Sequence, residues 1–238
     1  MNAPRFGAAP ERTMATAPML AMAPGPEQAS GSVPARAMES GWARLARTGA
    51  GPLGIDVERP QRLTLADGRC VRVRPVHPSD AAGEQAFVTT LSPQSRRRRF
   101  HGALRQLPSS VLQAMTSIDR RRSMALVAEA GCADGAARLV ADARYVIEDV
   151  IEDVIEERSR ERRSAEFAIA VADDWQGVGL GRALMRQLAG LALASGLREL
   201  QGMVLADNVP MLALMQQLGA RLRGDLHDAG IVRVSFAL

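Results

Sequence analysis

The sequence contains no lysine, so all thirty of its basic side chains are arginine. Aromatic residues make up only 3% of the chain. No apolar run approaches the roughly 20 residues of a membrane-spanning helix, so no membrane span is expected. The N-terminus also lacks the apolar core of a secretory signal. We therefore expect a cytoplasmic protein, with a transit peptide as the alternative for the N-terminal segment.

Cysteine and histidine are equally sparse. Cys70 and Cys132 lie in or beside strand-like runs and form no CxxC pair, so two buried thiols in a reducing cytosol are expected. His77, His101 and His227 show no metal-ligand spacing, which favours surface or helix-capping roles. We therefore expect no metal.

The composition changes along the chain. Residues 1–57 are rich in alanine, proline, glycine and methionine and show no sustained hydrophobic period, so we expect a disordered tail. Residues 58–238 contain the periodic segments and are expected to form one folded domain.

A glycine-rich loop is the most informative pattern in the chain. Residues 176–182 read Gln-Gly-Val-Gly-Leu-Gly-Arg and follow a mostly apolar, strand-like run at 165–171. Leucines then recur at helical spacing, at Leu180, Leu184, Leu188 and Leu191. Glycines leave backbone N–H groups accessible, and the start of a helix adds partial positive charge behind them. The loop is therefore suited to bind a pyrophosphate.

Three phosphate-binding patterns can be compared with this loop. The dinucleotide fingerprint G-x-G-x-x-G fits Gly177 and Gly179 but meets Arg182 at its third glycine, and only about 55 residues follow, too few for a doubly wound domain. The P-loop requires a lysine that the chain lacks. The pattern Q/R-x-x-G-x-G/A is matched in register by Gln176, Gly179 and Gly181. A glycine-rich turn without a ligand is the remaining alternative.

The matching pattern is the coenzyme A pyrophosphate loop of the GNAT family of N-acetyltransferases, which the chain resembles from about residue 60 to residue 238. The succession of predicted elements also resembles this family. Strands are predicted at 70–76, 124–128, 139–146, 165–171 and 200–205, and helices after His77 with Ser79 or Asp80 as the cap, from Leu180 to a stop at Gly196, and from Pro210 to a stop at Gly219.

The resemblance implies an α/β (α+β) fold. It implies a mixed, mostly antiparallel sheet of about six to seven strands, splayed between its fourth and fifth strands, with about four flanking helices. It also implies acetyl-CoA as co-substrate, with the pantetheine arm in the splay. The coenzyme-binding positions implied by the family motif are Ile169, Val171, Gln176, Gly177, Val178, Gly179, Leu180, Gly181, Arg182 and Asn208.

Shorter strings at 91–95, 99–100, 116–119 and 165–168 resemble a narrower branch. That branch contains bacterial protein lysine acetyltransferases that modify acyl-CoA synthetases. The resemblance implies acetyl transfer to a protein lysine, with such a synthetase as the protein partner. A small-molecule amine acceptor and a catalytically degenerate acetyl-CoA sensor stay open as alternatives.

Glu166 is the candidate general base. A lysine amine has a pKa near 10.4, so deprotonating it at neutral pH costs about 4–5 kcal/mol, and a carboxylate in a partly dry cleft can take the proton. Glu166 lies between apolar Ala165 and Phe167, where an acid is unusual without a role or a partner. In the resembling branch this glutamate is the base. An edge-strand carboxylate paired with an arginine is the alternative.

Two further family roles fall on particular positions. The resemblance implies a backbone N–H near Val171 as the donor to the developing oxyanion. Many members carry a tyrosine on the last helix that protonates the leaving thiolate, but Met215 occupies that position and the only tyrosine is Tyr145. The acid role is therefore vacant or filled by water.

Arginines cluster at 96–99 and 120–122, in a chain whose net charge is +4. Nucleic-acid binding would need interleaved aromatic residues, and only Phe100 is near, so no nucleic-acid partner is expected. An acidic partner surface, the phosphate of the coenzyme and a solvated face all fit the clusters.

A repeat departs from the family pattern. Val-Ile-Glu-Asp recurs from Val146 to Glu157, and a mostly basic run follows to Arg163. As a helix it would align its valines, and Glu156 would pair with Arg160. A tandem duplication in a surface loop and a dimer or partner contact are the two interpretations, and the oligomeric state stays undetermined.

Overall fold

A computed structural model describes residues 59–102, 105–131, 137–147 and 164–238. The predicted tail at 1–57, Cys132 and most of the repeat at 146–163 lie outside these residues. Among the described helices, none is long and apolar enough to cross a membrane.

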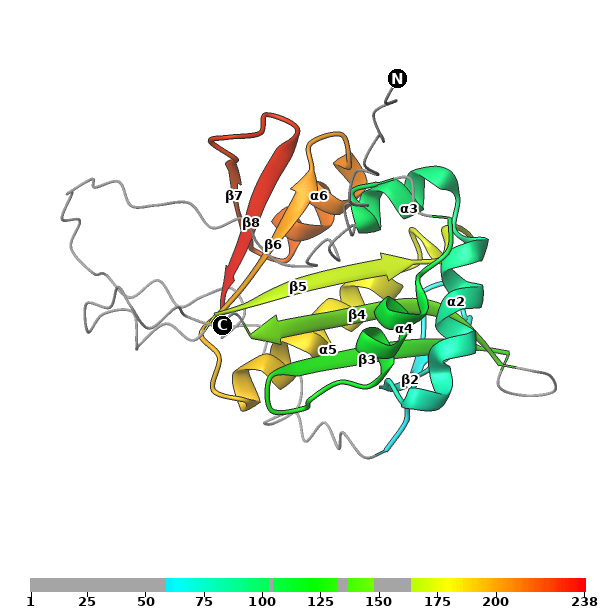
Figure 1. Ribbon diagram of the computed structural model, residues 1–238. Coiled ribbons are helices and arrows are strands. Elements are labelled where there is room, and N and C mark those ends of the chain that lie inside the picture. The colour runs from blue at the N-terminus through cyan, green and yellow to red at the C-terminus, as the bar shows by residue number, and fades with distance from the viewer. Residues whose placement is uncertain (1–58, 103–104, 132–136, 148–163) are drawn as a thin grey trace, which may run out of the picture. The chain divides into compact units, whose positions relative to one another are not determined.

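The described part is built on one sheet of eight strands. These are β1 (Gln61–Thr64), β2 (Cys70–Pro75), β3 (Ser123–Ala130), β4 (Arg138–Ile147), β5 (Ser164–Val171), β6 (Glu199–Leu205), β7 (Arg221–Gly224) and β8 (Ile231–Ala237). They lie in the order β1-β2-β3-β4-β5-β6-β8-β7, and only the β5–β6 pair is parallel (Figure 1). The expected mixed, mostly antiparallel sheet is confirmed. It exceeds the expected strand number because the short β1 pairs with β2 ahead of the first predicted strand.

Five α-helices accompany the sheet. They are α2 (Ala81–Thr90), α3 (Pro93–Phe100), α4 (Ser109–Thr116), α5 (Leu180–Ala194) and α6 (Val209–Gln217), with 3-10 turns η1 (Pro78–Asp80) and η3 (Asp173–Trp175). Helices α2 and α4 cover one face of the central strands, and α5 covers the other face (Figure 1). Gly196 and Gly219 follow the ends of α5 and α6 with φ of 79° and 84°, as their predicted roles as helix stops require.

Of the two predicted caps, Asp80 is the N-cap residue of α2, but its side chain makes no capping hydrogen bond to this helix. The N-cap of η1 is His77, whose Nδ1 accepts from the N–H of Ser79, and Asp80 accepts from the N–H of His77 at 2.7 Å. Asp80 precedes α2 without capping it through its side chain. Its carboxylate is instead held by the guanidinium of Arg74, with both N–O distances 2.7 Å.

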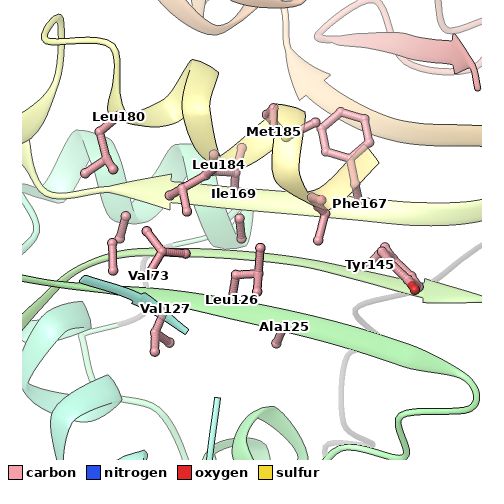
Figure 2. Packing of buried hydrophobic residues seen from close by; sticks show 14 of the residues in the cluster. Val73, Ala125, Leu126, Val127, Tyr145, Phe167, Ile169, Leu180, Leu184 and Met185 are labelled. Carbon is pink, nitrogen blue, oxygen red and sulfur yellow. The ribbon is translucent and has the colours of Figure 1, made fainter. Parts of the chain in front are cut away.

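The apolar face of α5 forms the centre of the core. Leu180, Leu184 and Met185 are fully buried. Figure 2 shows these side chains against Phe167 and Ile169 of β5. Burying each such side chain stabilises the fold by about 1.5–3 kcal/mol. The helical spacing of the leucines therefore fixes α5 on one face of β5.

Two other expectations are corrected. Cys70 lies in β2 but is only half-buried. Val146 and Ile147 are the last residues of β4, paired with Glu166 and Ala165, so a helix beginning at Val146 is excluded at its first two positions. A strand is favoured over a helix at these two positions because both residues are β-branched and each pairs with a residue of β5.

The sheet opens between β5 and β6. The two strands are paired only at Ser164–Glu199, Ala165–Leu200 and Glu166–Gln201. Beyond this point β5 stays paired with β4 as far as Val171, and β6 stays paired with β8 as far as Leu205. Each strand therefore follows its outer neighbour, and the predicted splay is confirmed (Figure 1).

Candidate active site

A cavity of about 350 Å³ occupies the opening beyond the last β5–β6 pair. Its walls come from α3, the end of β5, the segment at 175–182 and α6. Eight of the ten predicted coenzyme positions line it, namely Ile169, Val171, Gln176, Gly177, Gly179, Gly181, Arg182 and Asn208. The fold thus brings together residues that are separated by up to 39 positions in the sequence.

The glycine loop has the backbone that its sequence predicts. Gly177 and Gly179 have φ of 76° and 91°, and a Cβ at either position would meet nothing within 4 Å. These glycines are therefore required by the backbone conformation rather than by crowding. Gly179 is the N-cap of α5 and offers no side-chain cap, so the first N–H groups of the helix are left for a ligand.

Gly181 serves a different purpose. A Cβ at this position would lie 3.4 Å from Leu214 of α6 and 3.7 Å from Val171 of β5. The small residue therefore lets α5 start close to both elements, which keeps the loop at the open end of the cleft.

The loop is fastened to α3 by hydrogen bonds. Gln176 donates its Nε2 to the carbonyl of Val171 at 3.0 Å and to Oγ of Ser95 at 3.3 Å. Asp173 accepts from the N–H and the hydroxyl of Ser92, both at 2.8 Å, and from the hydroxyl of Ser95 at 2.7 Å. Burial raises the pKa of Asp173, but the hydrogen bonds from Ser92 and Ser95 lower it by a larger amount. The pKa of Asp173 therefore lies below the ordinary value. No pattern in the sequence predicts this link.

The backbone of β5 supplies donors along the opening. Ala172 donates its N–H to Val140 on the β4 side at 2.8 Å. Because N–H groups alternate between the two edges of a strand, those of Ile169 and Val171 face the opening. The expected N–H donor near Val171 therefore points into the cleft.

Comparison with known proteins decides the family. The sequence pattern that defines the GNAT acetyltransferase family matches residues 94–220. The chain belongs to the GNAT family of acetyltransferases. It is therefore an acyltransferase, as the sequence predicted.

Its relatives carry the same family name or activity. The chain is 35% identical over 156 residues to the acetyltransferase PA5475 of Pseudomonas aeruginosa, an alignment that covers 66% of this chain and 77% of the relative. It is 29% identical over 161 residues to the acetyltransferase Pat of Mycolicibacterium smegmatis, covering 68% of this chain and 44% of the relative. The chain thus spans less than half the length of Pat.

A solved structure confirms the fold. The crystal structure of the GNAT domain of S. lividans PAT superposes with a TM-score of 0.66 at 26% sequence identity, covering 75% of this chain and 97% of that domain. The α/β architecture with its open mixed sheet is therefore that of GNAT domains.

The predicted base lies on β5 at the last residue pair before β5 and β6 part. Glu166 is half-buried near the start of β5, between Val146 of β4 and Gln201 of β6, and belongs to the last pair before the strands part. Its side chain projects from the face opposite Phe167 and Ile169, because side chains alternate along a strand. It does not line the cavity itself.

Two predicted coenzyme positions also lie outside the cavity lining. The side chain of Leu180 is fully buried in the core, and that of Val178 is half-buried. Their backbone N–H groups can serve a phosphate, but their side chains cannot. Asn208, by contrast, is buried at the cleft wall as the N-cap of α6, where its Oδ1 accepts from the N–H of Met211 at 3.4 Å.

The described residues place no tyrosine at the cleft. Met215 is fully buried in the core. The hydroxyl of Tyr145 pairs with Oγ of Ser195 at 3.1 Å, and burial raises its pKa. Within the same residues, no group of three histidine, cysteine or acidic side chains is arranged to hold a metal ion.

The arginines of α3 do not form one solvated face. Arg96 donates to the carbonyls of Thr89 and Leu91, and Arg97 pairs with Asp207 at 2.6 Å near the surface. Arg98 and Arg99 line the cleft, and the side chain of Arg99 is only 5% exposed. The sequence does not predict this difference, because four consecutive arginines contain no apolar residues whose spacing would indicate the buried face of the helix.

Proposed function

We propose that this GNAT protein transfers the acetyl group of acetyl-CoA to a lysine side chain of another protein, with an acyl-CoA synthetase as the acceptor and the cytoplasm as the compartment. The observation that carries the proposal is the cleft that runs from the glycine loop along the unpaired edge of β5. The glycine loop suits phosphate binding, and Glu166, assigned to amine activation, lies further back on the same strand, outside the cavity lining.

Coenzyme binding is assigned to the loop and to β5. The backbone N–H groups at 178–182 and the positive end of α5 suit the pyrophosphate. The N–H groups of Ile169 and Val171 suit the amides of the pantetheine arm and the thioester oxygen, which gains negative charge during attack. Asn208 helps to fix the opposite wall by capping α6.

Amine activation is assigned to Glu166. Its carboxylate takes a proton from the lysine ammonium, directly or through a water, and the free amine then attacks the thioester carbon. The nitrogen then loses its second proton to water, and the bond from that carbon to sulfur breaks. The leaving thiolate takes a proton from water, since the described residues place no tyrosine at the cleft. Holding amine and thioester together supplies much of the rate.

The acceptor assignment is supported by the relatives named Pat and by the short strings of the protein-acetylating branch. A small-molecule amine is the second candidate acceptor. A sensor that binds acetyl-CoA without turnover is the third interpretation, favoured only by the tyrosine that is missing from α6.

The test is acetyl-CoA turnover with a panel of acyl-CoA synthetases and polyamines, followed by mass spectrometry. Because the chain has no lysine, every acetyl-lysine detected belongs to the acceptor. We expect a modified synthetase lysine. Acetylated polyamine without a modified synthetase would favour the small-amine enzyme, and binding of acetyl-CoA without any product would favour the sensor.

A further inference from the structure

Four charged side chains meet in the interior beneath α3. They are Glu84 of α2, Arg99 of α3, and Asp142 and Arg144 of β4. At most 5% of any of these side chains is exposed. They lie on the face of the sheet opposite α5, where burying charge is costly unless every group is paired.

Arg144 is fully engaged in this cluster. It donates to both carboxylate oxygens of Asp142, to the carbonyl of Met115 at 3.0 Å and to Oε1 of Glu84 at 3.4 Å. Arg99 is not. Its Nη2 lies 3.6 Å from Oδ1 of Asp142 and makes no hydrogen bond with the described residues.

The cluster also holds fewer negative charges than positive ones. Burial and the adjacent charge of Asp142 raise the pKa of Glu84 to about 8. Burial raises the pKa of Asp142 as well, but the guanidinium groups of Arg144 and Arg99 lower it more, so Asp142 stays ionised. At neutral pH two guanidinium groups therefore face one carboxylate, and one positive charge is left uncompensated.

Arg99, which carries this charge, lines the cleft. Arg99 and Arg98 line the cavity together with Ala170 of β5, which is the register partner of Asp142. The buried Nε of Arg98 has no hydrogen-bond partner among the described residues either, while its Nη2 lies 3.4 Å from the carbonyl of Asp207. Both arginines thus line one wall of the cleft, and each carries one buried N–H-bearing nitrogen without a hydrogen-bond partner among the described residues.

We propose that Arg98 and Arg99 form an anion subsite in the cleft, and that its ligand is a carboxylate carried by one of the two substrates. A guanidinium edge presents parallel N–H donors that match a planar carboxylate. The proposal rests on the proposed function for the course of the coenzyme. The phosphates have donors at 178–182, so a group at Ala170 lies further along β5, toward Glu166.

Two sources could supply this carboxylate. One is the acyl group, if the donor is a coenzyme A thioester of a dicarboxylic acid. The other is the acceptor, if a carboxylate neighbours the reactive amine. Both would place a negative charge beside Arg99, and both would compensate the buried cluster.

Calorimetric titration of the full chain with succinate tests the subsite, with uncharged succinamide as the matched probe. We expect succinate to bind and succinamide not to bind. Arg99→Met should weaken succinate binding by about tenfold or more, the loss typical of a charged hydrogen bond. Arg97→Met is the control variant, because Arg97 lies on the same helix but outside the cavity lining. Equal binding of the two probes, or equal effects of the two variants, would overturn the proposal.

A second measurement leaves Arg99 unchanged, in case its replacement prevents folding. Glu84 is faced by Asp142 and Arg144 from β4 and by Arg99 from α3. Its ionisation adds the missing negative charge, so the affinity of the wild type for succinate should fall as pH rises through about 8. Glu84→Gln cannot ionise and should keep its affinity. Parallel pH profiles for the two proteins would contradict the proposal.

Coenzyme thioesters distinguish the two sources. Succinyl-CoA that binds more tightly than acetyl-CoA in the wild type, but not in Arg99→Met, identifies the acyl group. Peptide amines that lose affinity in the variant only when they carry a carboxylate identify the acceptor. If Arg99→Met weakens acetyl-CoA as much as succinate, the anion is a coenzyme phosphate and the proposal fails. If acetyl-CoA does not bind at all while Arg99-dependent succinate binding persists, the proposed function fails and the subsite stands.

Discussion

Gln176 and Ser95 are hydrogen-bonded across the mouth of the cleft, with 3.3 Å between Nε2 and Oγ. The same hydroxyl of Ser95 donates to Asp173 at 2.7 Å. One serine thus joins the glycine loop to the turn before it and to α3. The geometry of the coenzyme loop therefore depends on a helix that precedes it by about 80 residues, a distance over which no local pattern extends.

Replacing Asp173 tests this connection. Asp173→Ala removes the acceptor of three hydrogen bonds from Ser92 and Ser95, and we expect a loss of about 1–2 kcal/mol in the free energy of unfolding and weaker acetyl-CoA binding. Asp174→Ala is the matched control, since it removes a surface pair with Arg138 and keeps the backbone carbonyl that accepts from Arg69. Urea unfolding and calorimetry measure the two effects. Indistinguishable variants would show that α3 does not support the loop.

The left-handed glycines allow a second comparison. Gly179 and Gly68 have φ of 91° and 82°, and a Cβ at either would meet nothing within 4 Å. Alanine at each position should therefore cost a similar amount of stability, about 1–2 kcal/mol. Only Gly179→Ala should lower the affinity for acetyl-CoA, because only Gly179 borders the cleft. Thermal shift with and without acetyl-CoA measures this, and an equal ligand response in both variants would argue against phosphate binding at the loop.

Glu166→Gln tests the base. The variant should lose turnover at neutral pH by about 100-fold, the usual contribution of a general base, while acetyl-CoA affinity stays unchanged. The deficit should shrink toward pH 10, where the amine loses its proton unaided. Rates at several pH values with a saturating acceptor measure the effect. A deficit that is constant with pH would assign Glu166 a structural role instead.

Gly202 lies at the point where the sheet opens. It follows the last residue of β6 that pairs with β5, and a Cβ there would lie 2.9 Å from the ring and 3.1 Å from the carbonyl oxygen of Phe167. Gly202→Ala should therefore cost about 1–3 kcal/mol through overpacking. Gly224→Ala, where a Cβ meets nothing within 4 Å, should be close to neutral. Urea unfolding of the two variants measures the difference, and equal stabilities would contradict a steric role for Gly202.

Glu84 gives a stability prediction with a definite sign. Its pKa is raised from 4.5 to about 8 in the folded protein, so the native state holds a proton that the unfolded chain has already lost. This contribution is fully present below pH 4.5 and disappears as pH rises toward 8. Glu84→Gln removes it. The stability of the variant relative to the wild type should therefore increase between pH 5 and pH 8, as unfolding at fixed pH values can measure. A constant difference would show that Glu84 is ionised in the native state.

The sequence was informative wherever the decisive signal is local. The glycine loop, the apolar strand before it and the leucines after it are contiguous, and their predicted structure is confirmed. The position of the splay, which the family resemblance implied, is confirmed as well. The short β1 was missed because four residues with alternating exposure at a sheet edge carry little periodic signal.

The rest depends on contacts between distant segments. Glu84, Arg99 and Asp142 meet only after α2, α3 and β4 have packed together, and each looks like an ordinary surface charge in the sequence. The α3 arginines were grouped as one basic cluster, although Arg97 is exposed and Arg99 is buried. Successive side chains of a helix point in different directions, so four consecutive arginines include both exposed and buried side chains.

The short pairing of β5 with β6 has a consequence for how the protein opens. Three residue pairs connect the strands β1–β5 to the segment that contains β6, α6, β7 and β8. This C-terminal segment is contiguous in sequence and its strands pair mainly with each other, while Phe236 of β8 packs against Phe167 of β5. A segment with so few pairing partners outside itself is where local opening without global unfolding is expected. A molecule lying in the cleft would touch both sides of this seam. Under the proposed function, bound acetyl-CoA therefore also links the two sides of the sheet. Its binding should slow amide hydrogen exchange in β6 and β8.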